Sequence, residues 1–276
     1  MTTVRCLDLS SISRLRLPII EDKNSLDQYF QKSLCLNCAT PLSGTYCSNC
    51  GQKRAQRLGR GEIRDLAWEQ ARKFEFSFIK ACVRVCLNPG RCAREFVLGA
   101  RTRNIHPFKL YLSVVVILLL VLTRINYLAT DDADLAKAYA LVQQYSKWSF
   151  SIGIVAMFLA SCVTFWRRGG FNWVEHLVLA TYTHSVVLIL AIISLLPLLF
   201  VSDPDLIRSH RALASRYLMP VEFLIVFYAA LQFFALDWRR QWWWAGICAI
   251  CYLAIKSALI WLYARAVIWI VLAQLT

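Results

Sequence analysis

The chain has 276 residues, 58% of them hydrophobic, and a mean hydropathy of +0.48, which excludes an ordinary soluble domain with its apolar fraction of about 45–50%. The net charge of +14 is uneven, because residues 1–110 hold 19 of the 31 Lys and Arg against 9 acidic residues, leaving 12 bases and 8 acids for the rest. The basic part is therefore expected to lie in water and the remainder in lipid.

The N-terminal region, residues 1–34, has no sustained hydrophobic period and no helix-capping signal. It also lacks the unbroken apolar core of about 7–15 residues that a cleavable signal peptide requires. We therefore expect a mostly flexible arm that stays in the cytoplasm.

Residues 35–52 contain two Cys-x-x-Cys pairs, Cys35 with Cys38 and Cys47 with Cys50, separated by eight residues. Thiols in the cytosol are kept reduced, so clustered cysteines there are more often metal ligands than disulfides. Four thiolates can close a tetrahedral shell about 2.3 Å from Zn²⁺. We predict one structural zinc in a ribbon; the alternative, a redox or disulfide pair, needs an oxidising compartment. A closed shell leaves no substrate position, which favours an interaction role over catalysis.

Residues 53–106 are predicted to form basic amphipathic juxtamembrane helices. Between Glu62 and Leu87 apolar residues recur at helical spacing, while the bases lie off that stripe. The apolar positions are Phe74, Phe78, Ala81, Cys82 and Val85, and the bases are Arg72, Lys73, Lys80 and Arg84. Asn88-Pro89-Gly90 breaks this helix, and a short helix over 91–98 follows, with Gly99 placed to cap it.

The region from Lys53 to Lys109 carries 14 bases against 5 acids. Each base near an anionic leaflet contributes about 1 kcal/mol, so anionic lipid headgroups are the expected partners. The same charges are explained equally well if their only role is to keep this region on the cytoplasmic side of the membrane. Nucleic acid is the least favoured partner, because no nucleic-acid-binding motif accompanies them.

Five apolar segments follow, each near or above the roughly 20 residues that span a bilayer. They predict an all-α integral membrane protein of about five helices within residues 107–276; a sixth span is left open. Pro197 is expected to kink or end the overlong third segment. The segments are about 107–128, 148–166, 171–201, 218–236 and 242–272.

Loop charges predict the orientation, because cytoplasmic loops carry the excess of Lys and Arg. Arg167-Arg168 and Arg239-Arg240 fall on the side of the basic N-terminal region, and the acidic loop 131–134 falls on the other. The N-terminus is therefore expected in the cytoplasm and the C-terminus outside. Arg208, Arg211 and Arg216 disagree with this orientation, because they would lie in a loop on the outer side. Tryptophans at 148, 166, 173, 238 and 242–244 fit interfacial belts.

Ionisable residues inside membrane segments are costly and are functional candidates. Lys256 in the fifth segment and Glu222 in the fourth are expected in the same half of the bilayer, where they can form an ion pair. That pair would either fix helix packing or lie on the path of a substrate or proton.

The third segment carries Glu175, His176 and His184, and the two histidines are about 80° apart around a helix. Their types suit a metal, but the spacing is not an HExxH arrangement. Hydrogen bonding between helices, with Thr181, Thr183 and Ser185, is the favoured interpretation over catalysis. Cys248 and Cys251 are interpreted as packing residues.

Several motifs resemble the bacterial domain-of-unknown-function family numbered 3667, and together they cover most of the chain after residue 34. Ala100 stands where the family pattern has lysine, which weakens anion binding by that triplet and leaves Arg101 as the candidate. The resemblance implies a bacterial inner-membrane protein without an established activity. The motifs are Tyr46-Cys47-Ser48-Asn49-Cys50-Gly51-Gln52, Asn88-Pro89-Gly90, Gly99-Ala100-Arg101, Pro107-Phe108-Lys109-Leu110-Tyr111-Leu112, Glu175-His176-Leu177-Val178 and the stretch 228–237.

The layout of an arm followed by five helices is also loosely similar to the Yip membrane-trafficking family. The leading hypothesis is a non-enzymatic inner-membrane scaffold that docks a cytoplasmic protein, with the C-terminus in the periplasm; oligomerisation is left open. One alternative is a small transporter or channel using Lys256, Glu222 and His184. Another is a metal-dependent membrane enzyme using Glu175, His176 and His184.

Overall fold

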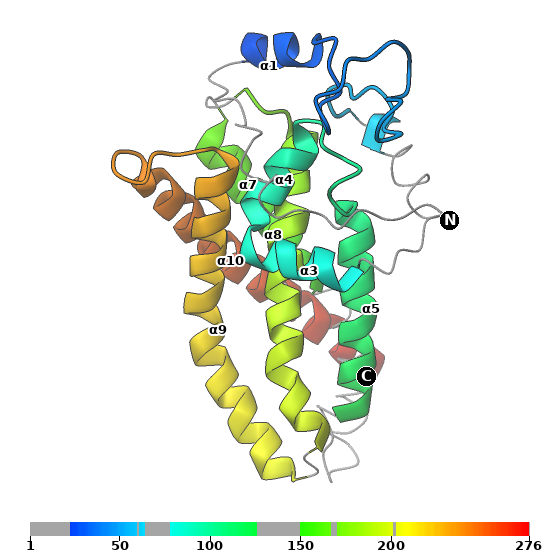
Figure 1. The fold of residues 1–276 in the computed structure, drawn as a ribbon. Coiled ribbons are helices and arrows are strands. Elements are labelled where there is room, and N and C mark those ends of the chain that lie inside the picture. The colour runs from blue at the N-terminus through cyan, green and yellow to red at the C-terminus, as the bar shows by residue number, and fades with distance from the viewer. Residues whose placement is uncertain are drawn as a thin grey trace, which may run out of the picture.

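The computed structural model describes residues 23–59, 61–63, 78–125, 150–166, 170–200 and 203–275. Its regular structure there is helical, apart from two isolated β-bridges near the N-terminus. Long helices run lengthwise through a bundle, and residues 23–59 lie at one end of it (Figure 1). The predicted acidic loop and much of the predicted basic helix, including Phe74, fall outside the described residues.

Four helices among the described residues are long and apolar enough to cross a membrane, which confirms the predicted all-α membrane class. The helices that contain these spans are α5 (Pro107–Ile125), α8 (Trp173–Leu195), α9 (Pro204–Phe233) and α10 (Trp242–Leu275). A 3-10 turn, η3 (Leu196–Phe200), continues α8. The α-helix therefore ends two residues before Pro197, because proline cannot donate the hydrogen bond that a helix interior needs.

Two predicted segments differ from the structure. The second is α7 (Ile152–Phe165), whose 14 residues fall short of the roughly 20 that span hydrocarbon. The described residues thus hold four candidate spans and one shorter apolar helix, which lies at the place of the predicted second segment. The predicted fourth segment corresponds to the candidate span Arg216–Phe233, but its helix α9 already begins at Pro204, because it extends through polar turns that a hydropathy window passes over. Arg216 therefore lies in a helix and not in a loop.

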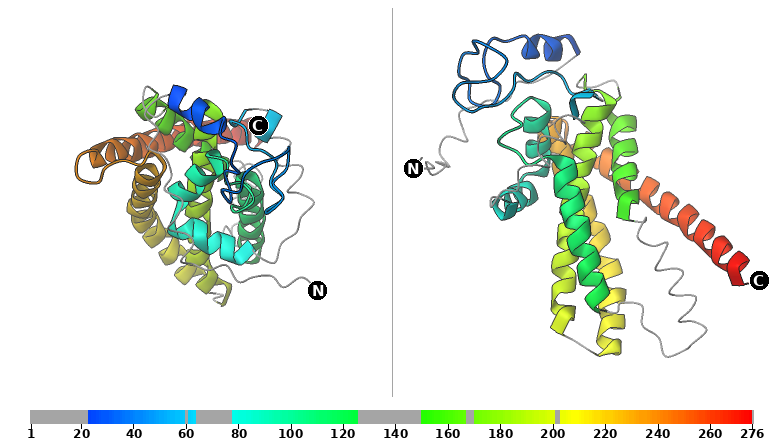
Figure 2. Two further views of the ribbon diagram at one scale, coloured as in Figure 1. Left: turned by 45° about the horizontal axis from the view of Figure 1, so that its top comes forward. Right: turned by 90° about the vertical axis from the view of Figure 1, so that its right-hand side faces the viewer.

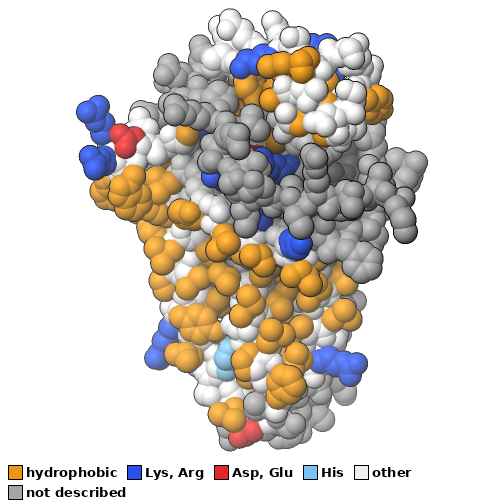
Figure 3. All heavy atoms as spheres, viewed as in Figure 1, with side chains coloured by type: hydrophobic (Ala, Val, Ile, Leu, Met, Phe, Trp, Pro, Cys, Tyr) orange, Lys and Arg blue, Asp and Glu red, His pale blue; other side chains and the backbone are white. Residues whose placement is uncertain are grey.

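Helix α8 is the centre of the bundle and packs against α4, α5, α7 and α9. It carries apolar residues on all sides, as expected of a helix surrounded by others. Helix α10 packs against α7 and α9, and its C-terminal half slants away from the other helices (Figure 2, right). A broad hydrophobic band covers the middle of one face, with Lys and Arg above and below it (Figure 3).

Two short helices, α3 (Phe78–Leu87) and α4 (Pro89–Val97), precede the first span. Val85 is buried, with Cys82 and Cys86 packed beside it against the core, so the predicted apolar stripe faces the bundle. A second apolar stripe, of Ile79, Val83 and Leu87, faces outward, so α3 is apolar on two sides. Eight of the nine residues of α4 are buried, which makes it part of the bundle and not a surface helix.

The ribbon, residues 34–53, forms two small hairpins closed by bridges between Leu34 and Pro41 and between Tyr46 and Lys53. It is preceded by α1 (Lys23–Phe30), inside the region predicted as a flexible arm. Leu26 of this helix is buried in contact with Leu98 after α4. Two helical turns without capping signals are too short for a sequence period to reveal.

Candidate functional site

The four ribbon cysteines converge as predicted. The Sγ atoms of Cys35, Cys38, Cys47 and Cys50 all lie within 4.8 Å of one another. The Cys35–Cys50 separation is 3.6 Å and the Cys38–Cys47 separation is 3.5 Å. Thiolates at about 2.3 Å from a tetrahedral Zn²⁺ are about 3.8 Å apart, so this cluster can hold a metal ion with little adjustment.

The backbone around the two cysteine pairs repeats the same hydrogen bonds. Cys35 N–H donates to Thr40 O at 2.8 Å, and Cys47 N–H donates to Gln52 O at 2.9 Å. Each turn ends on a residue with positive φ, Ala39 at 60° and Gly51 at 68°. Both turns therefore present their sulfur atoms alike, and Ala39 occupies a conformation that favours glycine.

The cysteine thiols do not share one environment. Burial raises the pKa of the Cys35 thiol to about 12. Burial acts in the same direction on Cys38, but hydrogen bonds from Thr40 outweigh it and lower the pKa of that thiol to about 6. Cys38 is therefore the more readily ionised of these two ligands.

Gln52, directly after the second cysteine pair, joins the ribbon to the membrane domain. Its Nε2 donates to Gly99 O at 2.6 Å. Its Oε1 accepts from the N–H of Arg101 at 3.0 Å and from the N–H and hydroxyl of Thr102 at 3.1 and 3.2 Å. The side chain is buried. The side-chain amide of Gln52 thus holds the turn that follows α4, and through this contact the ribbon is attached to the bundle.

The turn itself is shaped to receive the ribbon. Gly99 has φ +100°, and a Cβ there would lie 2.9 Å from the Leu36 side chain and 3.0 Å from that of Ala55. Arg101 pairs with Glu62 at 2.7 Å and also donates to Gln56 O. Burial lowers the pKa of Arg101. This candidate residue therefore anchors the segment after the ribbon.

A second anchor reaches α8, where the predicted candidate Glu175 is buried. Arg57 donates to Glu175 at 3.2 Å, to Asp27 of α1 at 2.9 Å and to Gly170 O at 2.5 Å. Glu175 also caps α8 reciprocally with Asn172, its carboxylate accepting from the Asn172 N–H at 2.6 Å. Glu175 thus stabilises the N-terminus of α8 and, through Arg57, holds the segment after the ribbon against this helix.

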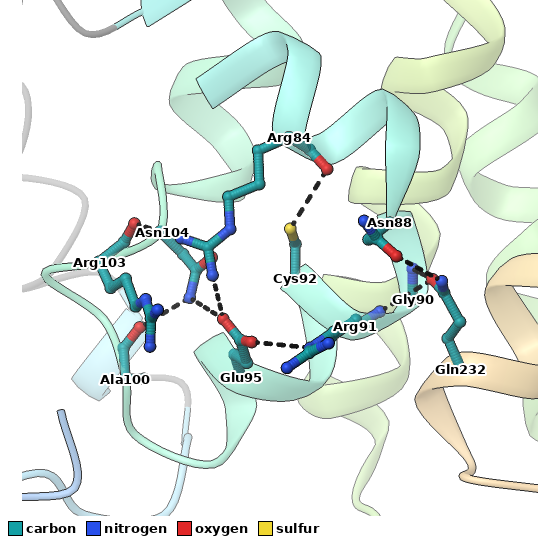
Figure 4. A network of polar contacts seen from close by, with 10 residues as sticks. All are labelled: Arg84, Asn88, Gly90, Arg91, Cys92, Glu95, Ala100, Arg103, Asn104 and Gln232. Carbon is teal, nitrogen blue, oxygen red and sulfur yellow. Dashed lines mark hydrogen bonds and ion pairs between the residues drawn. The ribbon is translucent and has the colours of Figure 1, made fainter. Parts of the chain in front are cut away.

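Beneath the ribbon lies a polar network around Glu95 (Figure 4). This buried carboxylate accepts from Arg84 at 2.5 Å, from Arg91 at 3.2 Å and from Asn104 at 3.3 Å. Asn104 also donates to Ala100 O at 2.9 Å. The network binds α3, α4 and the following loop together through one negative charge.

Helices α4 and α9 cap each other. Gln232 of α9 accepts from the N–H groups of Gly90 and Arg91 at 3.1 and 3.2 Å, which serves the open N-terminus of α4. In return Arg94 of α4 donates to Phe233 O at the end of α9. Burial lowers the pKa of Arg94 to about 10. Two segments of the family resemblance, Asn88-Pro89-Gly90 and 228–237, therefore meet in space.

Gly90 permits this contact. A Cβ at that position would lie 2.0 Å from the backbone oxygen of Ala229. The Asn88-Pro89-Gly90 motif, predicted only as a helix break, thus begins α4 and allows it to touch α9.

The intramembrane candidates form two separate groups. Lys256 Nζ lies 2.5 Å from the Glu222 carboxylate, which also accepts from the Tyr252 hydroxyl at 3.2 Å, so the expected ion pair is present. His176 Nδ1 lies 3.1 Å from Ser161 Oγ, and His184 Nε2 lies 2.6 Å from Phe150 O. Both histidines therefore bond to the segment that forms α7.

Within the part of the chain that the structure describes, the four cysteines are the one group of three or more His, Cys, Asp or Glu side chains with ligand atoms close enough to share a metal. Glu175 and the two histidines bond to separate partners. Sequence reasoning missed Gln52, Arg57, Glu95 and Gln232. Gln52 and Gln232 lie inside motifs of the family resemblance, which was the only signal that pointed to them.

Residues 77–119 match the model of a family described as a protein of unknown function (DUF3667). The match confirms the resemblance read from the sequence, and it covers α3, α4, the Glu95 network and the first part of α5. No curated protein and no solved structure matches the chain. The likeness to the Yip family stays a prediction.

Proposed function

We propose that this chain is a non-enzymatic membrane scaffold, in which a zinc-closed ribbon is mounted rigidly on the cytoplasmic end of a helical bundle and docks a protein partner. The buried Gln52 side chain supports this role most strongly, because it makes four hydrogen bonds to the turn after α4. A ribbon held this way cannot swing as a free arm. It presents one fixed surface to the water beside the membrane.

The chemistry of the cysteine cluster supports this role over catalysis. Four thiolates fill a tetrahedral shell around Zn²⁺ and leave no position for substrate. The bound ion would close both hairpins and hold the backbone that leads into Gln52. Its contribution is folding energy, as in other small domains that fold around a structural metal.

The outer surface of the ribbon is suited to a partner. Leu34 and Tyr46 are large apolar side chains, one on each hairpin, that are 41% and 59% exposed. Lys53, which pairs with Tyr46 in a β-bridge, and Arg54 are exposed too. Tyrosine and arginine are enriched at protein contact surfaces, and the aromatic ring loses little conformational entropy on binding. The opposite side of the ribbon is the side that Gln52 and Leu36 fix to the bundle.

Surface variants test the proposal better than deletion, because deleting the ribbon also removes the anchors at Gln52 and Arg57. In-cell crosslinking followed by mass spectrometry would compare wild type with Tyr46→Ser and Leu34→Ser. We expect one specific crosslinked protein to be lost from both variants, while zinc content stays at one per chain. The control is Lys23→Gln, an exposed change on α1. An unchanged set of crosslinked proteins in both ribbon variants would overturn the docking role.

The second candidate is a small transporter, favoured by the ion pair of Glu222 and Lys256 within two candidate spans. Charged side chains at membrane depth are costly and commonly mark ion or proton paths. The test is flux across vesicles that contain the purified protein. A flux that disappears in Lys256→Met would support transport, and its absence from wild type would count against it.

A further inference from the structure

An apolar groove of about 260 Å³ lies where α3 and α4 meet α8 and α9. Cys86 and Pro89 form one wall, Val186 of α8 the floor, and Leu224, Ile225 and Tyr228 of α9 the other wall. Tyr228 supplies the only hydroxyl of this lining. A groove of this composition takes a hydrocarbon chain and not a polar solute.

The depth of the groove places it inside the bilayer. The residues of α9 that line it precede the helix end at Phe233 by five to nine positions. At 1.5 Å per residue, the groove lies about 8–14 Å below that end. Both α8 and α9 are candidate spans, so the groove faces hydrocarbon. The elbow between α3 and α4 therefore sits within the lipid leaflet next to the ribbon.

The outer face of α3 agrees with this depth. Ile79, Val83 and Leu87 follow one another at intervals of four residues and are 76%, 53% and 64% exposed. Helices that lie in a membrane interface bury an apolar face about 5–10 Å into the boundary of headgroups and acyl chains. Lipid is the solvent that such a helix requires on its outer side.

Exposed bases lie on both helices of the elbow. Lys80 is exposed six residues before Cys86 along α3, about 9 Å by helical rise. Arg91 is the third residue of α4; its side chain pairs with Glu95 and is 42% exposed. A lipid whose chain enters the groove therefore meets positive charge on both helices of the elbow.

The geometry points to a binding site for one anionic phospholipid, with an acyl chain in the groove and its headgroup phosphate against Lys80 and Arg91. This inference does not rest on the docking role of the ribbon. The α3–α4 wall of the site lies within the segment that matches the family model. The site would hold α3 in the leaflet and so steady the helices that carry the ribbon.

The experiment uses the full-length protein, delipidated in detergent and titrated with phosphatidylglycerol or phosphatidylcholine while native mass spectrometry counts bound lipid. We expect wild type to bind one phosphatidylglycerol more tightly than phosphatidylcholine. Leu224→Trp fills the groove from an exposed position and should weaken binding about tenfold or more, the effect of losing one well-packed chain segment. The control is Leu120→Trp on the exposed face of α5, which should bind as wild type.

The charge is tested separately. Lys80→Gln should reduce the preference for phosphatidylglycerol about fivefold, as for one base at an anionic surface, and Arg239→Gln, outside the site, should leave it unchanged. Leu224→Ala, which shortens the wall without adding bulk, should weaken binding by a smaller factor. Equal binding of both lipids would overturn the assignment of the headgroup. Unchanged binding in Leu224→Trp would overturn the groove, and displacement by glycerol phosphate at the same concentration would assign the site to a free phosphate.

Discussion

At the ribbon end of the bundle, polar side chains join segments that are far apart in the chain, whereas three described hydroxyl groups towards the opposite end bond within their own helix. Gln52, Arg57, Glu95 and Gln232 each connect two or more elements. Near the other end, the hydroxyl groups of Thr123, Ser194 and Ser209 donate to a carbonyl three residues back on the same helix. The two ends therefore differ in what determines their structure.

The difference follows from the solvent around each end. In lipid, apolar burial drives little association between helices, and packing and interhelical hydrogen bonds determine the arrangement. At the ribbon end, polar side chains that are buried lose their hydrogen bonds to water. The protein itself must therefore supply their hydrogen-bond partners. The ribbon end is thus the part with one specific geometry, and we expect substitutions there to have the larger effects.

The largest effect is expected at Glu95. Glu95→Ala removes the carboxylate that accepts from Arg84, Arg91 and Asn104. Because the two arginines are 30% and 42% exposed and can regain water, we expect a cost near the lower end of the range for a broken buried ion pair, about 3 kcal/mol. Thermal unfolding in detergent should show a strongly lowered midpoint, with Glu95→Gln lowering it less because the amide can still accept hydrogen bonds. Asp237→Ala, an exposed acid at the same end, is the control and should change little. Equal midpoints for Glu95→Ala and Asp237→Ala would mean that the network does not organise this end.

Alanine substitutions at Gly90 and Gly246 compare a glycine at a close contact between two helices with a glycine that has open space around it. Gly90→Ala places a Cβ 2.0 Å from Ala229 O, so α4 must move away from α9 and lose the caps made by Gln232 and Arg94. We expect a loss of about 2–3 kcal/mol, within the range for overpacked sites. Gly246→Ala in α10 meets no atom within 4 Å and should be neutral or gain about 0.5–1 kcal/mol. Similar midpoints for the two variants would contradict the close approach.

The same contrast explains what the sequence can and cannot predict. The apolar spans follow from length and hydropathy, and Cys35, Cys38, Cys47 and Cys50 follow from spacing, because both signals are local. The ion pair of Glu222 and Lys256 follows from depth along two helices. By contrast, Gln52 and Gln232 are ordinary polar residues whose partners are 47 and 142 residues away. No local pattern records such contacts, so the mounting of the ribbon could not be predicted.

A smaller effect is expected where the ribbon meets the bundle. Gln52→Ala leaves the N–H of Thr102 without its partner and removes one hydrogen bond each from Arg101 N–H and Gly99 O, which still bond to each other at 3.0 Å, at a cost of about 1–3 kcal/mol. Hydrogen exchange at residues 99–102 should accelerate, while zinc content stays unchanged because the backbone oxygen of residue 52 still accepts from Cys47. Lys53→Ala, the exposed neighbour, should leave the exchange as in wild type. Loss of zinc together with faster exchange would show that metal binding and docking are one process.

The smallest effect distinguishes the two turns of the ribbon itself. Ala39 and Gly51 occupy equivalent positions with φ of 60° and 68°, and a residue with a Cβ is disfavoured there by about 1 kcal/mol. Ala39→Gly should therefore tighten zinc binding by up to about fivefold in competition with a chelator, and Gly51→Ala should weaken it by a similar factor, since both changes act on the same backbone conformation. If both variants bound zinc as wild type does, the left-handed turns would not contribute to the metal site, and the repeat between the two cysteine pairs would be one of sequence alone.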